Sequence, residues 1–277
     1  MKDAMDDFLE RFTPRREPGQ DEYAGEDGLL YCAKCHTPRQ CKVTVAGREH
    51  IFPCICNCQK EELEAAKRWA EEAERLIRIQ RLRANGIQER HLLDWTFDQA
   101  QDTRYVRMAK NYVGRWRQVK EQNLGLLLWG DVGTGKSFLA ACIANALIER
   151  GVPVLMTNFS KILNQMGGMY SEERYRYIAS FSQFPLLVID DLGIERGTEY
   201  ALEQVYGVVD ERYKSGLPLL VTTNLTIHEI RNATDVAHAR IFSRLLEMCT
   251  PVHIAGHDRR TAIGTAKQEL VKEVLFE

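Results

Sequence analysis

One run of eight residues constrains the fold of this chain more than any other part of its sequence: Gly130-Asp131-Val132-Gly133-Thr134-Gly135-Lys136-Ser137. An apolar stretch, Leu124–Trp129, precedes it, and a helical pattern beginning at Phe138 follows it. Glycines at this spacing let the backbone bend so tightly that successive N–H groups point into one concavity. The following helix adds the positive end of its dipole. The pattern therefore predicts a strand, a phosphate-binding loop and a helix, in that order.

Two side chains of this loop have specific chemical roles in the prediction. Lys136 would reach the β- and γ-phosphates of a nucleoside triphosphate, and the Ser137 hydroxyl would ligate Mg²⁺. ATP and Mg²⁺ are thus the expected ligands of this part of the chain. The predicted nucleotide-binding set is the loop with the residue that follows it: Gly130, Asp131, Val132, Gly133, Thr134, Gly135, Lys136, Ser137 and Phe138.

Three more apolar runs follow along the chain: Val152–Met156, Leu186–Ile189 and Leu217–Val221. Helical patterns, Phe138–Arg150 and Thr198–Ser215, alternate with them. Short continuous apolar runs are typical of strands buried on both faces, with the intervening helices covering the sheet. The sequence therefore predicts an α/β fold, with a parallel sheet in three layers.

Polar side chains follow two of these predicted strands. Asp190 and Asp191 come directly after Leu186–Ile189, and Asn224 follows the last run. In parallel α/β sheets the ligand crevice lies at the carboxyl ends of the strands. Asp190 is expected to join the Mg²⁺ shell, and Asp191 to position or deprotonate the attacking water. Asn224 is expected to touch the γ-phosphate or that water, which completes a catalytic group with Lys136.

The composition excludes several classes of protein. The 277 residues hold 37 Lys+Arg against 39 Asp+Glu, so bulk electrostatic coating of nucleic acid is excluded. No apolar run approaches the roughly 18 residues that a membrane span needs, and the start is acidic rather than typical of a signal peptide. We therefore expect a cytoplasmic protein that does not bind membranes.

A local basic patch is the remaining route to nucleic acid. Six basic residues lie between Arg104 and Lys120, with Tyr112 and Trp116 among them. This stretch favours either a backbone-and-stacking surface for single-stranded DNA or an amphipathic helix that packs its aromatic residues on the sheet.

Six of the eight cysteines lie between Cys32 and Cys58, whereas Cys142 and Cys249 are expected to be buried apolar fillers. Cytosolic thiols stay reduced, so a zinc site explains this cluster better than disulfides do. The two-spaced pair Cys32 and Cys35 would hold one face of a tetrahedral Zn²⁺, and the cysteines at 54–58 the other. Between these two groups of cysteines, segments 42–45 and 49–52 are predicted to form the strands of a hairpin, as in a zinc ribbon.

The segment Gln59–Ala84 contains no glycine or proline, and its acidic residues precede its basic ones, which predicts a helix that complements its own dipole. The polar start is expected to form a short helix and then a flexible acidic arm. The expected organisation is an acidic flexible arm, a zinc-binding module, a helical linker and an ATPase domain, at residues 1–28, 29–60, 61–88 and 89–277.

The phosphate loop, Leu186–Gly193, Thr222–Leu225 and Arg240–Leu245 together resemble the AAA+ ATPases of the DnaC/DnaI/IstB group. The closest resemblance is to phage-type DnaC-like replicative helicase loaders with an N-terminal zinc module. It implies an AAA+ P-loop domain without a C-terminal lid, and hydrolysis of ATP. The partners that it implies are a hexameric replicative helicase, single-stranded DNA and further copies of the chain, with ATP at the subunit interfaces.

The resemblance also assigns residues that the spacing alone does not. Arg244 matches the arginine finger, which stabilises transition-state charge at a neighbouring subunit's ATP. Arg240 would be a second interface arginine. Arg260, with Arg259 as the alternative, matches the sensor-2 arginine that contacts the γ-phosphate within one chain. A C-x-C knuckle completes the zinc site in this pattern and gives the ligands Cys32, Cys35, Cys56 and Cys58, with Cys54, Cys41 and His36 as alternatives.

The function that follows is ATP-dependent loading of a replicative helicase. Two alternatives remain at this point. One is an IstB-like transposition helper, whose ATPase core would look the same. The other is an interaction module that binds nucleotide as a switch and hydrolyses little of it.

Overall fold

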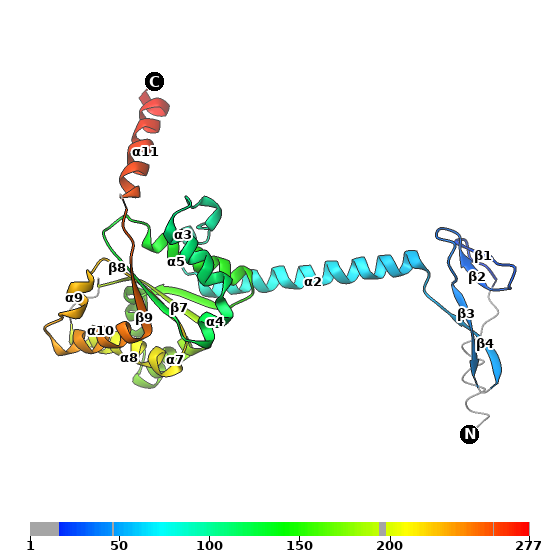
Figure 1. Ribbon diagram of the computed structural model, residues 1–277, viewed down its shortest axis with the longest axis horizontal. Coiled ribbons are helices and arrows are strands. Elements are labelled where there is room, and N and C mark those ends of the chain that lie inside the picture. The colour runs from blue at the N-terminus through cyan, green and yellow to red at the C-terminus, as the bar shows by residue number, and fades with distance from the viewer. Residues whose placement is uncertain (1–16, 46, 194–197, 257, 277) are drawn as a thin grey trace. The chain divides into compact units, whose positions relative to one another are not determined.

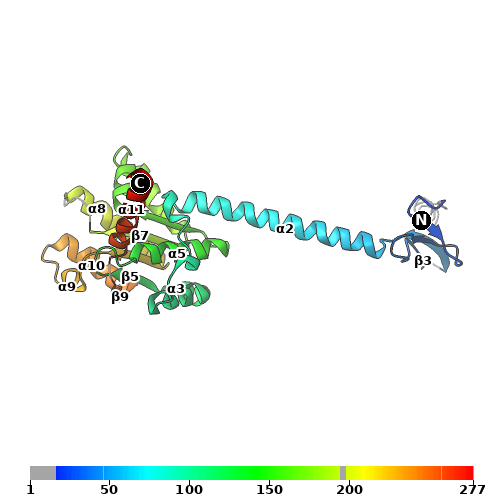
Figure 2. The ribbon, with the colours of Figure 1, turned by 90° about the horizontal axis from the view of Figure 1, so that it is seen from above.

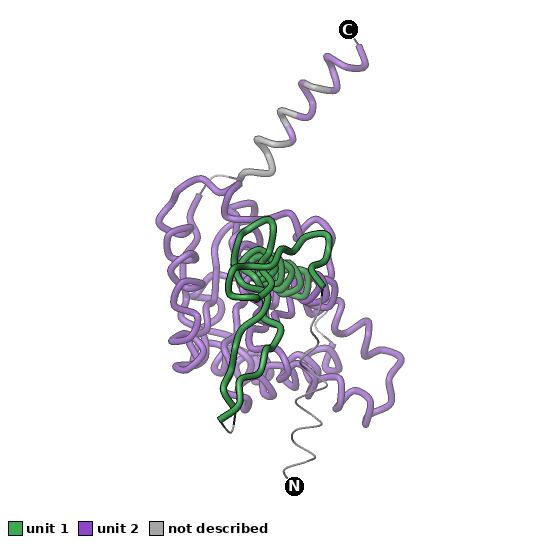
Figure 3. The backbone as a smooth tube through the Cα atoms, turned by 90° about the vertical axis from the view of Figure 1, so that its right-hand side faces the viewer, with its two compact units in different colours: residues 1–76 green, residues 77–277 purple. Residues whose placement is uncertain are grey.

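In the computed structural model the chain divides into two compact units, residues 1–76 and 77–277 (Figure 3). The boundary falls inside one helix, α2 (Asn57–Gly86), which confirms the helix predicted from Gln59 to Ala84. The structure describes residues 17–45, 47–193, 198–256 and 258–276. The short helix expected near the start of the chain lies outside these residues.

The first unit is built from two antiparallel hairpins. The second of them confirms the predicted hairpin. The first corrects the sequence analysis, since residues 22–24 form a strand where we expected a flexible arm. Tyr23 stacks on Tyr31 of the paired strand, and Glu22 forms an ion pair of 2.9 Å with Arg39. The strands are β1 (Glu22–Ala24), β2 (Leu30–Cys32), β3 (Gln40–Val45) and β4 (Arg48–Pro53).

The second unit contains a five-stranded sheet in which every pairing is parallel, in the order β6-β7-β8-β5-β9. The four predicted strands are confirmed with shifts of a few residues at their ends. The carboxyl ends of β5, β8 and β7 are neighbours in this order, so the segments that follow them meet at one edge. The strands are β5 (Gly125–Trp129), β6 (Val154–Asn158), β7 (Leu186–Leu192), β8 (Leu219–Thr223) and β9 (Cys249–His253).

Helices cover both faces of this sheet, as Figures 1 and 2 show. Alternate residues of one strand point to opposite cores: Leu126 and Leu128 pack with α3 and α5, while Leu127 packs with α6, α8 and α10. This double burial explains the continuous apolar runs and confirms the three-layer α/β fold. The helices are α3 (Arg104–Gly114), α4 (Trp116–Glu121), α5 (Lys136–Glu149), α6 (Phe159–Met166), α7 (Ser171–Ser180), α8 (Glu199–Ser215), α9 (Ile227–Arg231), α10 (Val236–Met248) and α11 (Arg259–Phe276).

The aromatic residues of the basic stretch belong to the core. Tyr112 and Val113 are buried, and Trp116 packs partly against the same cluster. The packing interpretation is therefore confirmed for these rings, which are not available to stack on bases. The basic side chains between Arg104 and Lys120 are all exposed.

Strand β9 was not predicted. Its five residues include Thr250 and Pro251, and it lies at the edge of the sheet, where proline is tolerated and burial is incomplete. It follows α10 without a break, so no turn signal marks it. Its first residue, Cys249, and Cys142 on α5 are buried fillers as expected, and burial raises the pKa of both thiols to about 12.

In the described part of the chain one helix, α11, follows β9 where a lid would stand in larger AAA+ proteins. None of the described helices combines the length and the apolar character that crossing a bilayer would require.

Gly125 begins β5 where three backbones converge. An added Cβ would lie 2.5 Å from Met248 O and 2.6 Å from Leu219 O. Because neither carbonyl can rotate away, Gly125→Ala is expected to lower the free energy of unfolding by about 1–3 kcal/mol, measured by denaturant titration. Gly114→Ala is the control, since its Cβ meets no atom within 4 Å; equal stabilities of the two variants would contradict the packing.

Candidate active site

The phosphate loop connects the carboxyl end of β5 to the first turn of α5. Gly135 caps that helix with a φ of 96°, a backbone conformation that side-chain-bearing residues rarely adopt. Gly133 has a φ of 79°, and an added Cβ there would collide with the Asp258 carboxylate. The first residues of α5 thus present their N–H groups at the loop, as phosphate binding requires.

Lys136, the first residue of α5, is buried against the phosphate loop. Its Nζ donates to Gly130 O at 2.8 Å and to Asp131 O at 2.7 Å. Thr134 Oγ1 also donates to Asp131 O, at 2.9 Å. These contacts hold the ammonium at the mouth of the loop, where an oxygen of a bound phosphate can replace a carbonyl.

The two carboxylates at the end of β7 are held by a residue of the neighbouring strand. The buried Thr222 donates from Oγ1 to Asp190 Oδ1 at 2.6 Å. Thr222 Oγ1 also accepts a hydrogen bond from Asp191 N at 2.9 Å. Asp191 has a φ of 61°, next to an irregularity in the pairing of β7 with β8. Asn224 Nδ2 then donates to Asp191 Oδ1 at 3.0 Å.

These elements line a single cavity of about 220 Å³. It joins the phosphate loop and the start of α5 to the polar ends of β7 and β8. The structure therefore brings together residues that are spread from residue 95 to residue 224 of the sequence. The lining is Trp95, Val132, Gly133, Gly135, Lys136, Ser137, Phe138, Asp190, Asp191 and Asn224.

Trp95 is a member of this cavity that the sequence analysis missed. Its ring lies 5.7 Å from that of Phe138, centroid to centroid. The buried Asn145 of α5 holds residues 92–95 in place, because its side-chain amide donates to Leu92 O at 2.8 Å and to Trp95 O at 3.0 Å. A lone amide in an otherwise apolar stretch of α5 was the available signal. Thr222 is a second residue of the site that the sequence analysis did not assign, and its place after a predicted strand was the available signal.

Arg240 and Arg244, which were assigned by resemblance, are not among the residues that line this cavity. Arg244 of α10 forms an ion pair with Asp210 at 2.8 Å and stacks over Tyr206 of α8. Tyr206 and Asp210 raise the pKa of its guanidinium. Arg240, one turn earlier, is exposed. The side chains of Arg259 and Arg260 lie outside the described part of the structure, at the start of α11.

The four cysteines Cys32, Cys35, Cys56 and Cys58 come together in the first unit, with all four sulfurs within 4.8 Å of one another. A tetrahedral zinc site with ligands at about 2.3 Å has sulfurs about 3.8 Å apart, so this set fits the ion. The three alternatives lie outside the cluster. The Cys54 thiol donates to Pro38 O, His36 contacts the Tyr23 hydroxyl, and Cys41 pairs with Phe52 in the hairpin.

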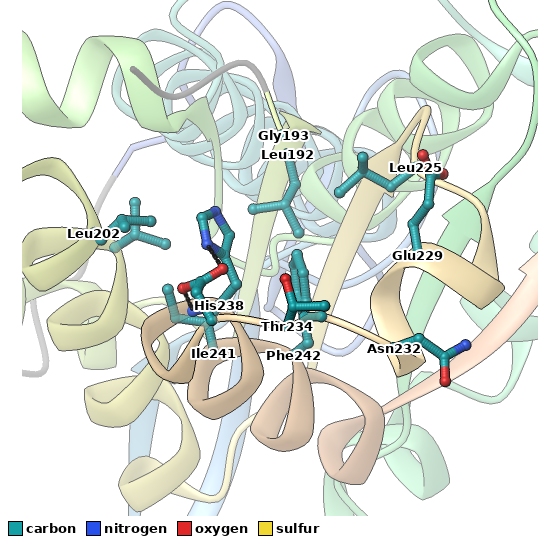
Figure 4. A pocket seen from close by; sticks show the side chains of 13 residues that line it. Leu192, Gly193, Leu202, Leu225, Glu229, Asn232, Thr234, His238, Ile241 and Phe242 are labelled. Atoms are coloured by element: carbon teal, nitrogen blue, oxygen red, sulfur yellow. Dashed lines mark hydrogen bonds and ion pairs between the residues drawn. The ribbon is translucent and has the colours of Figure 1, made fainter. Parts of the chain in front are cut away.

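A second cavity, of about 350 Å³, lies beside the first between α8, α9 and α10 (Figure 4). Leu202, Ile241 and Phe242 make much of its wall, and Glu229 and Asp235 stand at it. Hydrogen bonds from the backbone N–H groups of Thr226 and His238 lower the pKa of these two carboxyls, so both are charged at neutral pH. The smaller cavity also holds two carboxylates, but it contains Lys136 and the phosphate loop, whereas no lysine or arginine is among the described residues that line the larger one. This difference in donors to phosphate favours the smaller cavity as the nucleotide site.

Residues 59–264 match the family of IstB-like ATP binding proteins. The chain belongs to this family. Its ATPase domain is of the IstB/DnaC-like AAA+ type, which confirms the resemblance.

Two replicative helicase loaders are similar to about half of the chain. The replicative helicase loader DnaI of Bacillus subtilis is 29% identical over 49% of this chain and 47% of its own length. The replicative helicase loader DnaC of Escherichia coli K12 is 31% identical over 49% of this chain and 57% of its own. A crystal structure of DnaI is 25% identical and covers 65% of this chain and all of its own, with a TM-score of 0.53. The chain thus spans about half the length of the two loaders.

Thr222→Val is expected to lower ATP turnover about tenfold or more, because it removes the hydroxyl that holds Asp190 and the Asp191 backbone. Nucleotide affinity should change less, since the phosphate loop is intact. Thr222→Ser keeps the hydroxyl and should retain most of the activity. Steady-state phosphate release, with nucleotide titrations, measures both effects; a valine variant as active as the serine variant would refute this role.

Proposed function

We propose that this protein is an ATP-dependent loader of a hexameric replicative helicase. The observation that carries the ATPase part is the single cavity that contains Lys136, Ser137, Asp190, Asp191 and Asn224. The loader part rests on the similarity to DnaI and DnaC. In this proposal ATP binding promotes assembly with the helicase and single-stranded DNA, and hydrolysis releases the loader.

Each side chain of the cavity has a distinct task. The ammonium of Lys136 exchanges its loop carbonyls for phosphate oxygens. Ser137 and Asp190 would hold Mg²⁺, which neutralises phosphate charge when bound. Asp191 orients the attacking water, or accepts its proton, and Asn224 keeps that carboxylate in place through the bond to Oδ1. Trp95 offers an aromatic face for the base.

Hydrolysis would be completed by a neighbouring copy of the chain. Arg244 remains the proposed arginine finger, but its guanidinium is held by Asp210 and Tyr206 of its own chain. Reaching a neighbour's phosphate would therefore require that the phosphate compete with the Asp210 carboxylate. The exposed Arg240, on the same helix, would be the second arginine of that interface, and Arg260 would act on the nucleotide of its own chain.

In the first unit, we propose a structural Zn²⁺ held by Cys32, Cys35, Cys56 and Cys58. Cys32 and Cys56 are buried, and few other described side chains of this unit are, so apolar burial alone stabilises it little. This zinc-binding module would be joined by a helical linker to the ATPase domain, and would contribute to binding of the helicase.

Lys136→Ala is expected to weaken ATP binding at least about tenfold, because it removes the charged donor that faces the phosphates. It should also abolish loading of the host's replicative helicase onto circular single-stranded DNA. Fluorescent-nucleotide titration and a helicase-recruitment assay measure the two effects. Lys120→Ala, at an exposed site of α4, should keep normal nucleotide affinity. If the wild-type protein binds ATP but recruits the helicase equally well with and without ATP, the loader function is contradicted.

Removal of zinc is expected to unfold the first unit while the ATPase domain keeps its melting transition, because the sulfur cluster lies in residues 1–76 alone. Mass spectrometry of the native protein should find one zinc per chain. Cys35→Ser should lose the metal, and Cys41→Ser, a cysteine outside the cluster, should keep it. A protein purified without added chelator that carries no zinc would refute the site.

A further inference from the structure

Helix α2 carries an apolar seam that no described part of the chain covers. Leu63, Ala66, Ala70, Ala73 and Ile77 follow one another at spacings of three and four residues, and all five are exposed. Spacings of this kind place side chains in one line along a helix, as at the a and d positions of a coiled coil. Two larger apolar residues, Trp69 and Leu76, flank the seam and are 78% and 51% exposed.

The seam lies on the face of α2 opposite to the one that packs within the second unit. Ile79 is 5% exposed, and Leu82 packs against the same core cluster, whereas Ile77 is 49% exposed. At 100° per residue, Ile79 and Leu82 point away from the line of the seam. The exposed apolar line is therefore not a continuation of the packing that anchors the helix.

The charges of α2 are distributed unevenly along its length. Residues 59–74 hold six acidic and three basic side chains, and residues 75–86 hold four arginines and no acidic residue. A parallel pair of such helices would place like charges side by side. An antiparallel pair about the middle of α2 keeps the two arginine-rich segments apart and sets each against residues 57–68 of the other helix, which hold three acidic and three basic side chains.

We infer that the seam of α2 pairs with the α2 helix of a second copy of this chain, in antiparallel orientation and with the two-fold axis between Ala70 and Ala73. In this register Ala70 meets Ala73 of the second copy, and Ala66 meets Ile77. The small central side chains allow close approach of the two helices. Trp69 and Leu76 of the two copies cover one flank.

The other flank of the same register contains a specific charge pair. Lys67 lies beside Glu74 of the second copy, and the two-fold axis repeats the pair. Both side chains are exposed and lie seven residues apart in one helix, too far to pair within it. A helix of unrelated sequence would not in general place opposite charges beside both Lys67 and Glu74. A second copy in antiparallel orientation does so, because its own Glu74 and Lys67 lie at those places. This inference does not depend on the proposed ATPase.

The pairing is tested by sedimentation equilibrium of the full-length, zinc-loaded protein without nucleotide, over a wide range of concentration. The wild type is expected to form a reversible dimer. Lys67→Glu and Glu74→Lys should each raise its dissociation constant about tenfold, because the axis doubles each lost pair. The double variant, Lys67→Glu with Glu74→Lys, restores opposite charges across the axis and should return the constant to near its original value.

Arg68→Glu is the matched control, since it reverses the adjacent charge on the opposite face of α2 and should leave the dimer unchanged. A parallel pair would place Lys67 beside Glu62 instead, and the double variant would not recover. Failure of that recovery, or equal damage by Arg68→Glu, would overturn the inference. So would a wild type that stays monomeric, including one whose seam becomes protected only when a helicase is added.

Discussion

The parallel pairing of β8 with both β5 and β7 is the constraint on which the candidate site depends. It brings the phosphate loop, the two aspartates and Asn224 to one edge, and it places Thr222 between Asp190 and the Asp191 amide. The left-handed backbone at Asp191 costs about 1–2 kcal/mol for a residue with a side chain. The hydrogen bond that its amide donates to Thr222 offsets part of that cost, so the strand pairing also sets the direction of the carboxylate.

The parts of this arrangement that local sequence determines were predictable. The phosphate loop is read from glycine spacing, and the strands from apolar runs that are continuous because both faces are buried. The contacts that refine the site join residues far apart in the sequence, and a single sequence does not show them. Asn145 reaches a carbonyl 53 positions earlier, at Leu92, and Arg244 pairs with Asp210 on another helix. An edge strand such as β9 lacks the two-sided burial that makes its neighbours recognisable.

The two units differ in how many apolar side chains they bury. The ATPase domain has two hydrophobic clusters, one on each face of its sheet, and its helix α5 is buried over most of its length. In the described residues of the first unit, only Leu29 and Leu30 join the two buried cysteines in the interior. So small an interior does not compensate for the loss of chain entropy. The proposed Zn²⁺ on the four sulfurs would supply the missing stability, whereas in the ATPase domain the thiols of Cys142 and Cys249 only fill space.

The two proposed self-contacts differ in symmetry, and this difference has a consequence for assembly. The antiparallel α2 pair is isologous and closes with two copies. An arginine finger that reaches a neighbour's nucleotide is heterologous, and such contacts generate rings or open filaments. A dimer joined through α2 places its two ATPase domains about a two-fold axis, which an arginine-finger interface does not share. If both contacts form, ATP favours the assembly in which Arg244 no longer pairs with Asp210. The free energy of this shift is limited by the difference in ATP affinity between the two assemblies. The ion pair of Arg244 with Asp210 is thus one of the terms that set how much nucleotide the change requires.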